Sequence, residues 1–277
     1  MLSPRITQRI AATIIWLCTA ATLLVMFFIV TYIFWHGLPG LRLSFFSQSA
    51  QNMGKEGGVF SFIVATLYLA GLAILVATPL GVGTAIYLTE YTREGRMTSV
   101  IRFGADCLAG VPSIIFGLFG FVFFVIYLNL GWSVLAGGLT LAIMVLPTII
   151  RTSEEAIRAV PRSYRDVAFS LGSTRWQMVT RVVLPTAVPG ILTGVILSIG
   201  RSVSETAAVM LTAGAALATP IFLNDSGRTL AYHFYILARE GISMPNAYKT
   251  ATVLILAILC INFAAYWLMK RFIARLS

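Results

Sequence analysis

This sequence has few charged residues. They make up 11% of its 277 residues, whereas 58% are apolar and the mean hydropathy is +0.88. A soluble domain contains about 25% charged residues, so the composition excludes a chain whose whole surface faces water. Cysteine is scarce as well, since only Cys18, Cys107 and Cys260 occur, far apart and inside apolar runs. An odd number of distant cysteines does not suit a disulfide framework, and we expect all three to be packing residues.

Three further absences narrow the chemistry. No G-x-x-x-x-G-K-[ST] motif occurs, so the chain lacks the usual loop that cradles nucleotide phosphates. Neither His36 nor His233 has a second ligand at metal spacing. The net charge of +10 does not come from aromatic-interleaved basic clusters, because the basic residues lie between apolar runs. We therefore expect a chain that is not an enzyme, binds no cofactor or metal and has no nucleic-acid partner.

Long apolar runs are what the sequence has in abundance. A bilayer core of about 30 Å needs roughly 20 apolar helical residues. Six runs qualify: Ile10–Trp35, Val59 to about Tyr91, Val100 to about Asn129, Gly131–Ile150, about Thr186 to Leu217, and Thr250–Met269. The first run is too long for a signal-peptide core and no A-x-A site follows it, so we expect a retained helix. The sequence thus predicts an all-α polytopic membrane protein with six transmembrane helices.

The basic residues predict the orientation of these helices. With a cytoplasmic N-terminus, 14 of the 20 lysines and arginines fall inside, five fall outside and Arg201 lies within a span. This bias predicts that both termini are cytoplasmic, because loops on that side are enriched in basic residues. Residues 36–58 and 218–249 are then the outside loops, and residues 151–185 form a long cytoplasmic loop.

The cytoplasmic loop contains two predicted helices. Glu154–Leu171 forms the first, and Gly172 ends it. Arg175–Val183 forms the second, which we expect Pro185 to end. Two short helices joined at a glycine make a compact knob that can receive force from a soluble partner.

Three ionisable residues, Asp106, Arg201 and Glu205, lie within apolar runs. Each costs about 2.5–3.5 kcal/mol at a helix centre, so we expect them to face the interior, to pair or to line a wet cavity. Arg201 and Glu205 are four residues apart and are expected to form an ion pair on one helix face. Either this pair only neutralises itself at a helix interface, or Arg201 lines an anion path and Glu205 holds its guanidinium.

Small residues and a proline predict close helix contacts. Gly190, Gly194, Ser198 and Ser202 repeat every four residues and form a ridge against which another helix can pack. Pro112 removes a helix hydrogen bond in the third run, which predicts either a broken helix that acts as a gate or a merely kinked helix.

The cytoplasmic loop resembles a known motif. It is similar to the EAA loop of ABC importer permeases, whose pattern is E-A-A, three residues, G, nine residues and I-x-L-P. The matching residues are Asp166–Gly172 and, after nine further residues, Val182-Val183-Leu184-Pro185. Asp166 and Val167 depart from the Glu and Ala of that pattern. In the family this loop is the coupling helix that seats in a groove of the ATPase subunit. The resemblance assigns coupling to Asp166, Ala168, Ser170, Leu171, Gly172, Leu184 and Pro185.

Two other segments are similar to phosphate importer permeases of the PstA type. Gly200–Ala207 resembles G-R-x-x-x-E-T-A, and Val111–Gly120 resembles V-P-S-I-x-x-G-L-x-G. The resemblance implies a five-helix type I (MetI-like) permease core in residues 59–277, after an N-terminal helix and outside loop in residues 1–58. It implies these site residues: Arg201, Glu205 and Asp106 for the substrate pathway, and Pro112, Ser113, Gly117, Gly120, Gly190 and Gly194 for gating or packing.

The resemblance also implies partners. They are a PstC-type permease, PstB-type ATPase subunits that carry ATP and Mg, and a PstS-type phosphate-binding protein outside the bacterial inner membrane. Three alternatives stay open: a permease for sulfate, molybdate or another oxyanion; a channel or secondary transporter that works alone; and an anchor or sensor that transports nothing.

Overall fold

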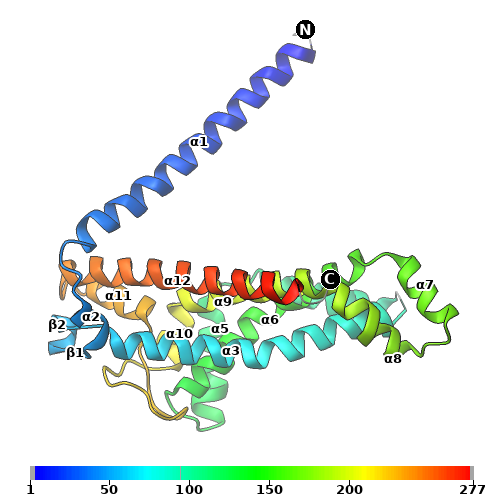
Figure 1. The fold of residues 1–277 in the computed structure, drawn as a ribbon. Coiled ribbons are helices and arrows are strands. Elements are labelled where there is room, and N and C mark those ends of the chain that lie inside the picture. The colour runs from blue at the N-terminus through cyan, green and yellow to red at the C-terminus, as the bar shows by residue number, and fades with distance from the viewer. Residues whose placement is uncertain (1–3, 94, 275–277) are drawn as a thin grey trace.

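A computed structural model describes residues 4–93 and 95–274, and its long helices form an elongated bundle (Figure 1). The helices are α1 (Pro4–Gly37), α2 (Leu43–Ser47), α3 (Phe60–Ile86), α4 (Arg96–Ala109), α5 (Ser113–Gly120), α6 (Val134–Ala159), α7 (Arg162–Ser170), α8 (Arg175–Met178), α9 (Leu184–Ser204), α10 (Ala207–Thr212), α11 (Leu230–Arg239) and α12 (Met244–Ile273). Short 3-10 or π turns are η1 (Asn52–Gly54), η2 (Tyr87–Tyr91), η3 (Phe121–Tyr127) and η4 (Val179–Val183). Strands β1 (Ala50–Gln51) and β2 (Glu56–Gly57) form one antiparallel pair. The all-α prediction is confirmed, with this small hairpin as its only departure among the described residues.

The membrane-spanning helices agree with five of the six predicted runs. In the described part of the chain, five stretches are long and apolar enough to cross a bilayer: Gln8–Gly37, Phe60–Tyr91, Val134–Ala159, Arg175–Ser204 and Met244–Arg271. The remaining run, Val100 to about Asn129, for which Pro112 predicted a broken or a kinked helix, is α4 followed by α5 and η3, bent by 101° at the break. Pro112 directly precedes α5, and its ψ of 140° lies outside the helical region. Proline has no N–H to donate to the preceding turn and disfavours helix in the residue before it, so α4 cannot continue unbroken into α5. The helix is therefore broken rather than kinked.

Several predicted boundaries were wrong. The helix predicted for Glu154–Leu171 is divided at Pro161, with Glu154 in α6 and α7 beginning at Arg162. The fourth span does not stop at Ile150, since α6 continues to Ala159. The fifth does not run to Leu217, since α9 ends at Ser204 and the short α10 follows. Pro185 does not end a helix, because the helical path runs from α8 through the π turn η4 into α9, with Pro185 in the first turn of α9. The predicted outside loop 218–249 also contains α11 and the first residues of α12.

The core forms where α3 and α6 pack together with α5 and α10. Leu69 of α3 and Leu141, Met144 and Ile149 of α6 are fully buried there. The predicted small-residue ridge of α9 faces α6. A Cβ added at Gly190 would lie 2.5 Å from the Cβ of Ala156, and one at Gly194 would overlap the side chain of Thr152. The ridge is thus a packing seam, as predicted.

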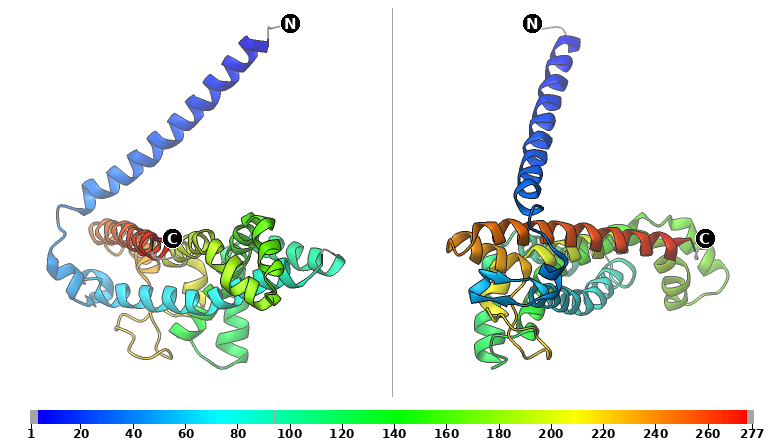
Figure 2. Two further views of the ribbon diagram at one scale, coloured as in Figure 1. Left: turned by 45° about the vertical axis from the view of Figure 1, so that its right-hand side comes forward. Right: turned by 60° about the vertical axis from the view of Figure 1, so that its left-hand side comes forward.

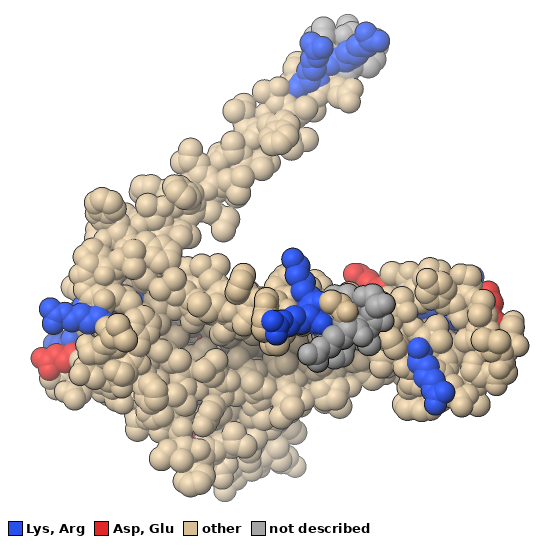
Figure 3. Space-filling model, in the orientation of Figure 1, with Lys and Arg blue, Asp and Glu red and all other residues tan. Residues whose placement is uncertain are grey.

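Helix α1 lies apart from this core. Two further views show that it leaves the bundle at the end where α2, β1 and β2 lie and projects away from it (Figure 2). None of its most apolar stretch is buried. The three cysteines are free and exposed, so they are not packed within this chain as the prediction of packing residues expected. On the face shown in Figure 3, charged side chains gather at the tip of α1, at the two ends of the bundle and beside the C-terminal end of α12, and most of the remaining surface is uncharged.

Candidate functional site

Two broken helices meet inside the bundle. One break separates α4 from α5, and the other separates α9 from α10 at Glu205 and Thr206. A Cβ added at Gly117 of α5 would lie 2.8 Å from the Cα of Ala208 and 3.2 Å from the carbonyl oxygen of Ala207, both in α10. Only glycine permits this contact. The segments Val111–Gly120 and Gly200–Ala207 therefore form one structural unit.

Helix α6 supports the other side of α5. A Cβ at Gly120 would lie 2.7 Å from Thr140 Cγ2, and the Thr140 hydroxyl donates to the carbonyl of Ala136 at 2.8 Å. Ser113 begins α5 and is half-buried, whereas Pro112 is exposed at the bend. Gly117 and Gly120 thus serve packing, and the gating role predicted for this segment stays a prediction.

Glu205 caps the second break. Its backbone is extended, with ψ 133°, and its Oε1 accepts hydrogen bonds from the N–H groups of Thr206, Ala207 and Ala208 at 3.2, 3.1 and 3.4 Å. A carboxylate at this position satisfies donors that would otherwise be unpaired at the start of α10. The predicted ion pair with Arg201 was wrong, because pairing at a four-residue spacing needs a continuous helix and α9 ends at Ser204.

Arg201 lies on the side of α9 that the chain leaves uncovered. Thr193, Leu197 and Ser204, at helical spacing from it, are exposed, and Leu197 has 59% of its surface exposed. Its neighbours on the ridge, Ser198 and Ser202, are buried. Within residues 4–93 and 95–274, no acidic side chain pairs with the half-buried Arg201 guanidinium. Its charge is available to a group from outside this chain.

Asp106 belongs to a different contact. It forms an ion pair with Arg151 of α6, whose Nε lies 2.6 Å from Asp106 Oδ1. Both side chains are partly exposed, 50% for Asp106 and 36% for Arg151. Asp106 therefore ties α4 to α6 and is not part of the group at the α9–α10 break.

The far end of the bundle carries the predicted knob, formed by α7 and α8 (Figure 1). Gly172 has φ +80°, a left-handed conformation that glycine adopts without strain, and it turns the chain between the two helices. Thr174 then caps α8, accepting from the N–H of Gln177 while the Gln177 side chain accepts from the N–H of Thr174. From there the helical path continues through η4 into α9. A displacement of the knob thus acts directly on the helix that carries Arg201.

The predicted coupling residues lie on both sides of this knob. Asp166, Ser170, Leu171 and Gly172 are exposed, Ala168 is buried, and Leu184 and Pro185 are half-buried. Sequence reasoning missed the large apolar side chains beside them: Tyr164, Val167, Phe169 and Trp176 are 46–65% exposed, and Leu171 is 82% exposed. An apolar surface of this kind on a polar lobe marks a site for a protein partner.

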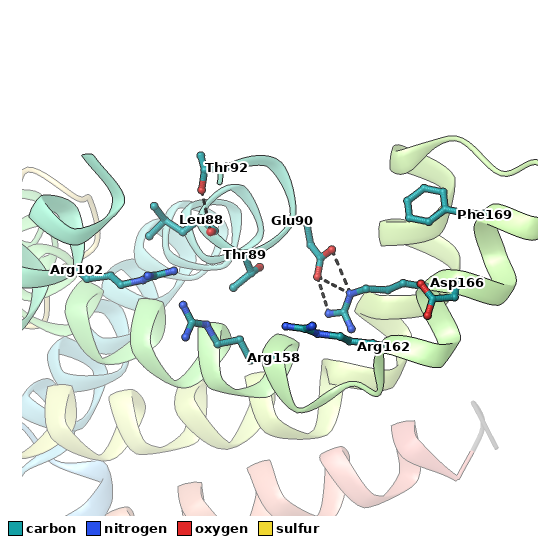
Figure 4. Close-up of a pocket in the computed structure, with 10 residues that line it drawn as sticks. Leu88, Thr89, Glu90, Thr92, Arg102, Arg158, Arg162, Asp166 and Phe169 are labelled. Carbon is teal, nitrogen blue, oxygen red and sulfur yellow. Dashed lines mark hydrogen bonds and ion pairs between the residues drawn. The ribbon is translucent and has the colours of Figure 1, made fainter. Parts of the chain in front are cut away.

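A second group missed in the sequence joins the knob to the bundle. Arg165 of α7 pairs with Glu90 of η2, Nη2 to Oε1 at 2.6 Å, and dashed lines at Glu90 mark this contact in Figure 4. Arg165 also donates to the carbonyls of Val160 at 2.7 Å and Ile157 at 2.9 Å. Val160 directly follows the last turn of α6, and the Ile157 carbonyl in that turn also accepts from the Val160 N–H at 3.3 Å. One side chain thus ties α7 to the ends of both α3 and α6. Arg165 and Glu90 are 75 residues apart, so no local pattern joins them.

Glu154 anchors α4 beside this joint. It is 3% exposed, and its Oε1 accepts from Arg102 Nε at 2.7 Å and Arg158 Nη2 at 2.8 Å. The arginines line a cleft of about 530 Å³ together with Glu90 and Asp166 (Figure 4). The end of the bundle near the knob is therefore held together by ion pairs between helices.

Known proteins are similar in sequence to this chain over most of its length. The family described as binding-protein-dependent transport system inner membrane component matches residues 77–277. The chain is 31% identical over 281 residues to the probable ABC transporter permease protein YqgI of Bacillus subtilis (strain 168), covering 95% of each. It is 38% identical over 221 residues to the phosphate transport system permease protein PstA 1 of Mycobacterium tuberculosis (strain CDC 1551 / Oshkosh), covering 79% of this chain and 72% of that protein. Identity to the phosphate transport system permease protein PstA of Pasteurella multocida (strain Pm70) is 33%, covering 90% and 86%.

Solved structures show the same fold. A bacterial alginate ABC transporter, in complex with an alginate pentasaccharide-bound periplasmic protein, gives a TM-score of 0.64 at 16% identity and covers 93% of this chain and 95% of that chain. The MetNI methionine ABC transporter in an inward-facing conformation gives 0.59 at 20% identity, covering 78% and 94%. The predicted MetI-like fold is confirmed by these likenesses.

Proposed function

Because the chain belongs to the family of binding-protein-dependent transport system inner membrane components, it is a multi-pass permease subunit of an ABC importer, and we propose that it translocates inorganic phosphate. The observation that carries the proposal is the unpaired Arg201 beside the junction of the two broken helices. An arginine presents a planar set of donors that suits phosphate oxygens. Glu205 is occupied by the start of α10, so it leaves that guanidinium free for an anion.

The uncovered side of α9 would face a second, PstC-type permease, with the anion path between the two subunits. Asp106 and the α4–α5 break would act at the wall of this path, with Pro112 and Ser113 at the bend. A PstS-type binding protein would dock on the opposite end from the knob, on residues 36–58 and 218–249. In this arrangement both termini are cytoplasmic, residues 1–58 precede the permease core of residues 59–277, and the basic loop 151–185 faces the ATPase.

PstB-type subunits would bind and hydrolyse ATP with Mg, and this chain would receive the resulting motion. The exposed apolar side chains of the knob, Leu171 above all, supply a docking surface for a groove on the ATPase. Arg165 would pass that displacement to α3 and α6.

The test is ATP-dependent uptake of labelled phosphate by the assembled complex in liposomes. Arg201→Ala is expected to lower uptake about tenfold or more, because a hydrogen bond between charged groups contributes about 1.5–3 kcal/mol. Thr193→Ala, on the same side of α9, is the matched control and should transport normally. Both variants must co-purify with their partners.

Two outcomes would contradict the proposal in different ways. If sulfate or molybdate enters with ATP and phosphate does not, the substrate is wrong and the permease role remains. If phosphate crosses without ATP or any partner, the chain is a stand-alone channel or secondary transporter and the coupling role is wrong.

A further inference from the structure

A basic pocket lies at the end of the bundle opposite the knob. Its volume is about 330 Å³, and its wall is formed by Gly40, Arg42, Ser44, Phe45, Gly57 and Lys249. Two side chains of this wall are cationic and none is acidic. The pocket therefore has the charge and the hydroxyl donor that suit a phosphate group.

Lys249 is held in place for this role. Its Nζ donates to Asn246 Oδ1 at 3.3 Å, and Asn246 Nδ2 donates in turn to the carbonyls of Gly54 at 3.0 Å and Lys55 at 2.8 Å. The ammonium also lies 5.8 Å from the centre of the Phe45 ring. These contacts order the lysine before a ligand arrives, which lowers the entropy lost on binding.

An apolar groove adjoins the pocket. It has a volume of about 420 Å³ and is lined by Thr31, Phe34, Trp35, Leu38 and Pro39, which follow helical spacing along one side of α1 and its end. Pro39 is followed directly by Gly40 of the basic pocket, so the groove and the pocket are neighbours. Trp35 is 76% exposed and Leu43, next to Arg42, is 91% exposed. Tryptophan and leucine side chains exposed beside basic residues are typical of the bilayer surface at headgroup level.

We propose that the pocket binds the phosphate group of an anionic phospholipid and that one acyl chain of this lipid lies in the groove. Charge and shape both favour a lipid, because a free phosphate ion would fill only the pocket and leave the groove unused. The lipid would lie at the joint between α1 and the bundle, where α1 is otherwise held by Tyr32 and His36 against Tyr248. The inference does not depend on which substrate the permease carries.

The test is native mass spectrometry of the purified importer complex from micelles containing equal amounts of phosphatidylglycerol and phosphatidylcholine. The wild type is expected to retain phosphatidylglycerol in preference. Arg42→Gln and Lys249→Gln should each lower its retention about fivefold, the effect expected of one basic residue at an anionic lipid surface. Lys249→Arg keeps the charge and should retain the lipid. Lys55→Gln, exposed at the same end but outside the pocket, is the matched control.

The second arm separates the two sources of phosphate. Excess inorganic phosphate should leave the bound phosphatidylglycerol in place, and a short-chain phosphatidylglycerol should be retained less than a long-chain one. The proposal is overturned if inorganic phosphate displaces the lipid, if both lipids are retained equally, or if the two glutamine variants of assembled complex retain as much lipid as Lys55→Gln.

Discussion

Each end of the bundle holds a buried arginine, and the two ends balance its charge differently. At the knob, Arg165 is 16% exposed and pairs with Glu90 of another helix. At the opposite end, Arg228 is 8% exposed and donates to the carbonyl of Ala215 at 2.8 and 3.2 Å, with the rings of Phe62 and Tyr232 against its guanidinium. No carboxylate pairs with Arg228 among the residues that the structure describes.

The two kinds of contact, an ion pair at Arg165 and neutral partners at Arg228, have different mechanical consequences. An ion pair between two helices can transmit a displacement from one to the other, because both partners move with their helices. A cation held by one carbonyl, the Nδ1 of His233 and two aromatic rings instead fastens a loop to the bundle, and it carries a desolvation cost that lowers the pKa of Arg228. We infer that the knob end transmits movement, whereas the opposite end is a fixed frame.

Among the changes considered, reversing the charges of Arg165 and Glu90 should have the largest effect on phosphate uptake. Arg165→Glu places two carboxylates together and removes the side-chain donor from the Val160 carbonyl, while the Ile157 carbonyl keeps only the Val160 N–H. Losing a largely buried ion-pair partner costs about 3–5 kcal/mol of stability. With this joint between the helices broken, ATP-dependent uptake by the complex that still assembles should fall. Adding Glu90→Arg restores the opposite charges and should recover part of the uptake, measured together with ATPase activity in the assembled complex. If the double variant transports no better than Arg165→Glu, the pair does not transmit movement.

Acid should weaken the opposite end through His233. Burial, and then the charge of Arg228, lower the pKa of His233 to about 3, against about 6.5 in an unfolded chain. Between these values the unfolded chain binds the extra proton, so stability is complete above pH 6.5 and falls as the pH drops towards 3. At pH 5 the loss is about 2 kcal/mol.

The measurement for His233 is thermal unfolding of the detergent-purified complex at pH 7.5 and pH 5. His233→Phe, which can keep the stacking on Phe62, should lose less stability than the wild type over this interval. An equal loss in both proteins would show that other groups cause the acid sensitivity.

Substitutions of Gly172, at the turn of the knob, should have the smallest effect on stability and uptake. Gly172→Ala forces an L side chain into a positive φ and should cost about 1–2 kcal/mol, although no atom lies within 4 Å of the added Cβ. Gly172→Asn should cost less, because asparagine tolerates this conformation. The ratio of phosphate uptake to ATP hydrolysis is expected to fall more in the alanine variant. Equal ratios in both variants would mean that the backbone conformation at this turn does not control coupling.

Local patterns predicted the parts of the fold that depend on neighbouring residues. The spans followed from the length of the apolar runs, the turn of the knob from Gly172, and the α9 seam from glycines spaced four apart. Local patterns left the structure undecided, or predicted it wrongly, where the same pattern is compatible with two conformations. Pro112 permits either a kink or a break, and packing of α5 between α6 and α10 decides for the break. The Arg201–Glu205 pair failed because α9 ends between them.

The sequence by itself determined that this protein lies in a membrane and which apolar runs are long enough to cross it, because hydropathy and helix signals act over a few turns. Only the tertiary structure decided which charges pair. Glu90 meets Arg165 and Asp106 meets Arg151 across distant parts of the chain, while Arg201 and Arg228 meet no acid in the described residues. An ion pair depends on which helices pack side by side, and that arrangement is set by contacts along the whole bundle.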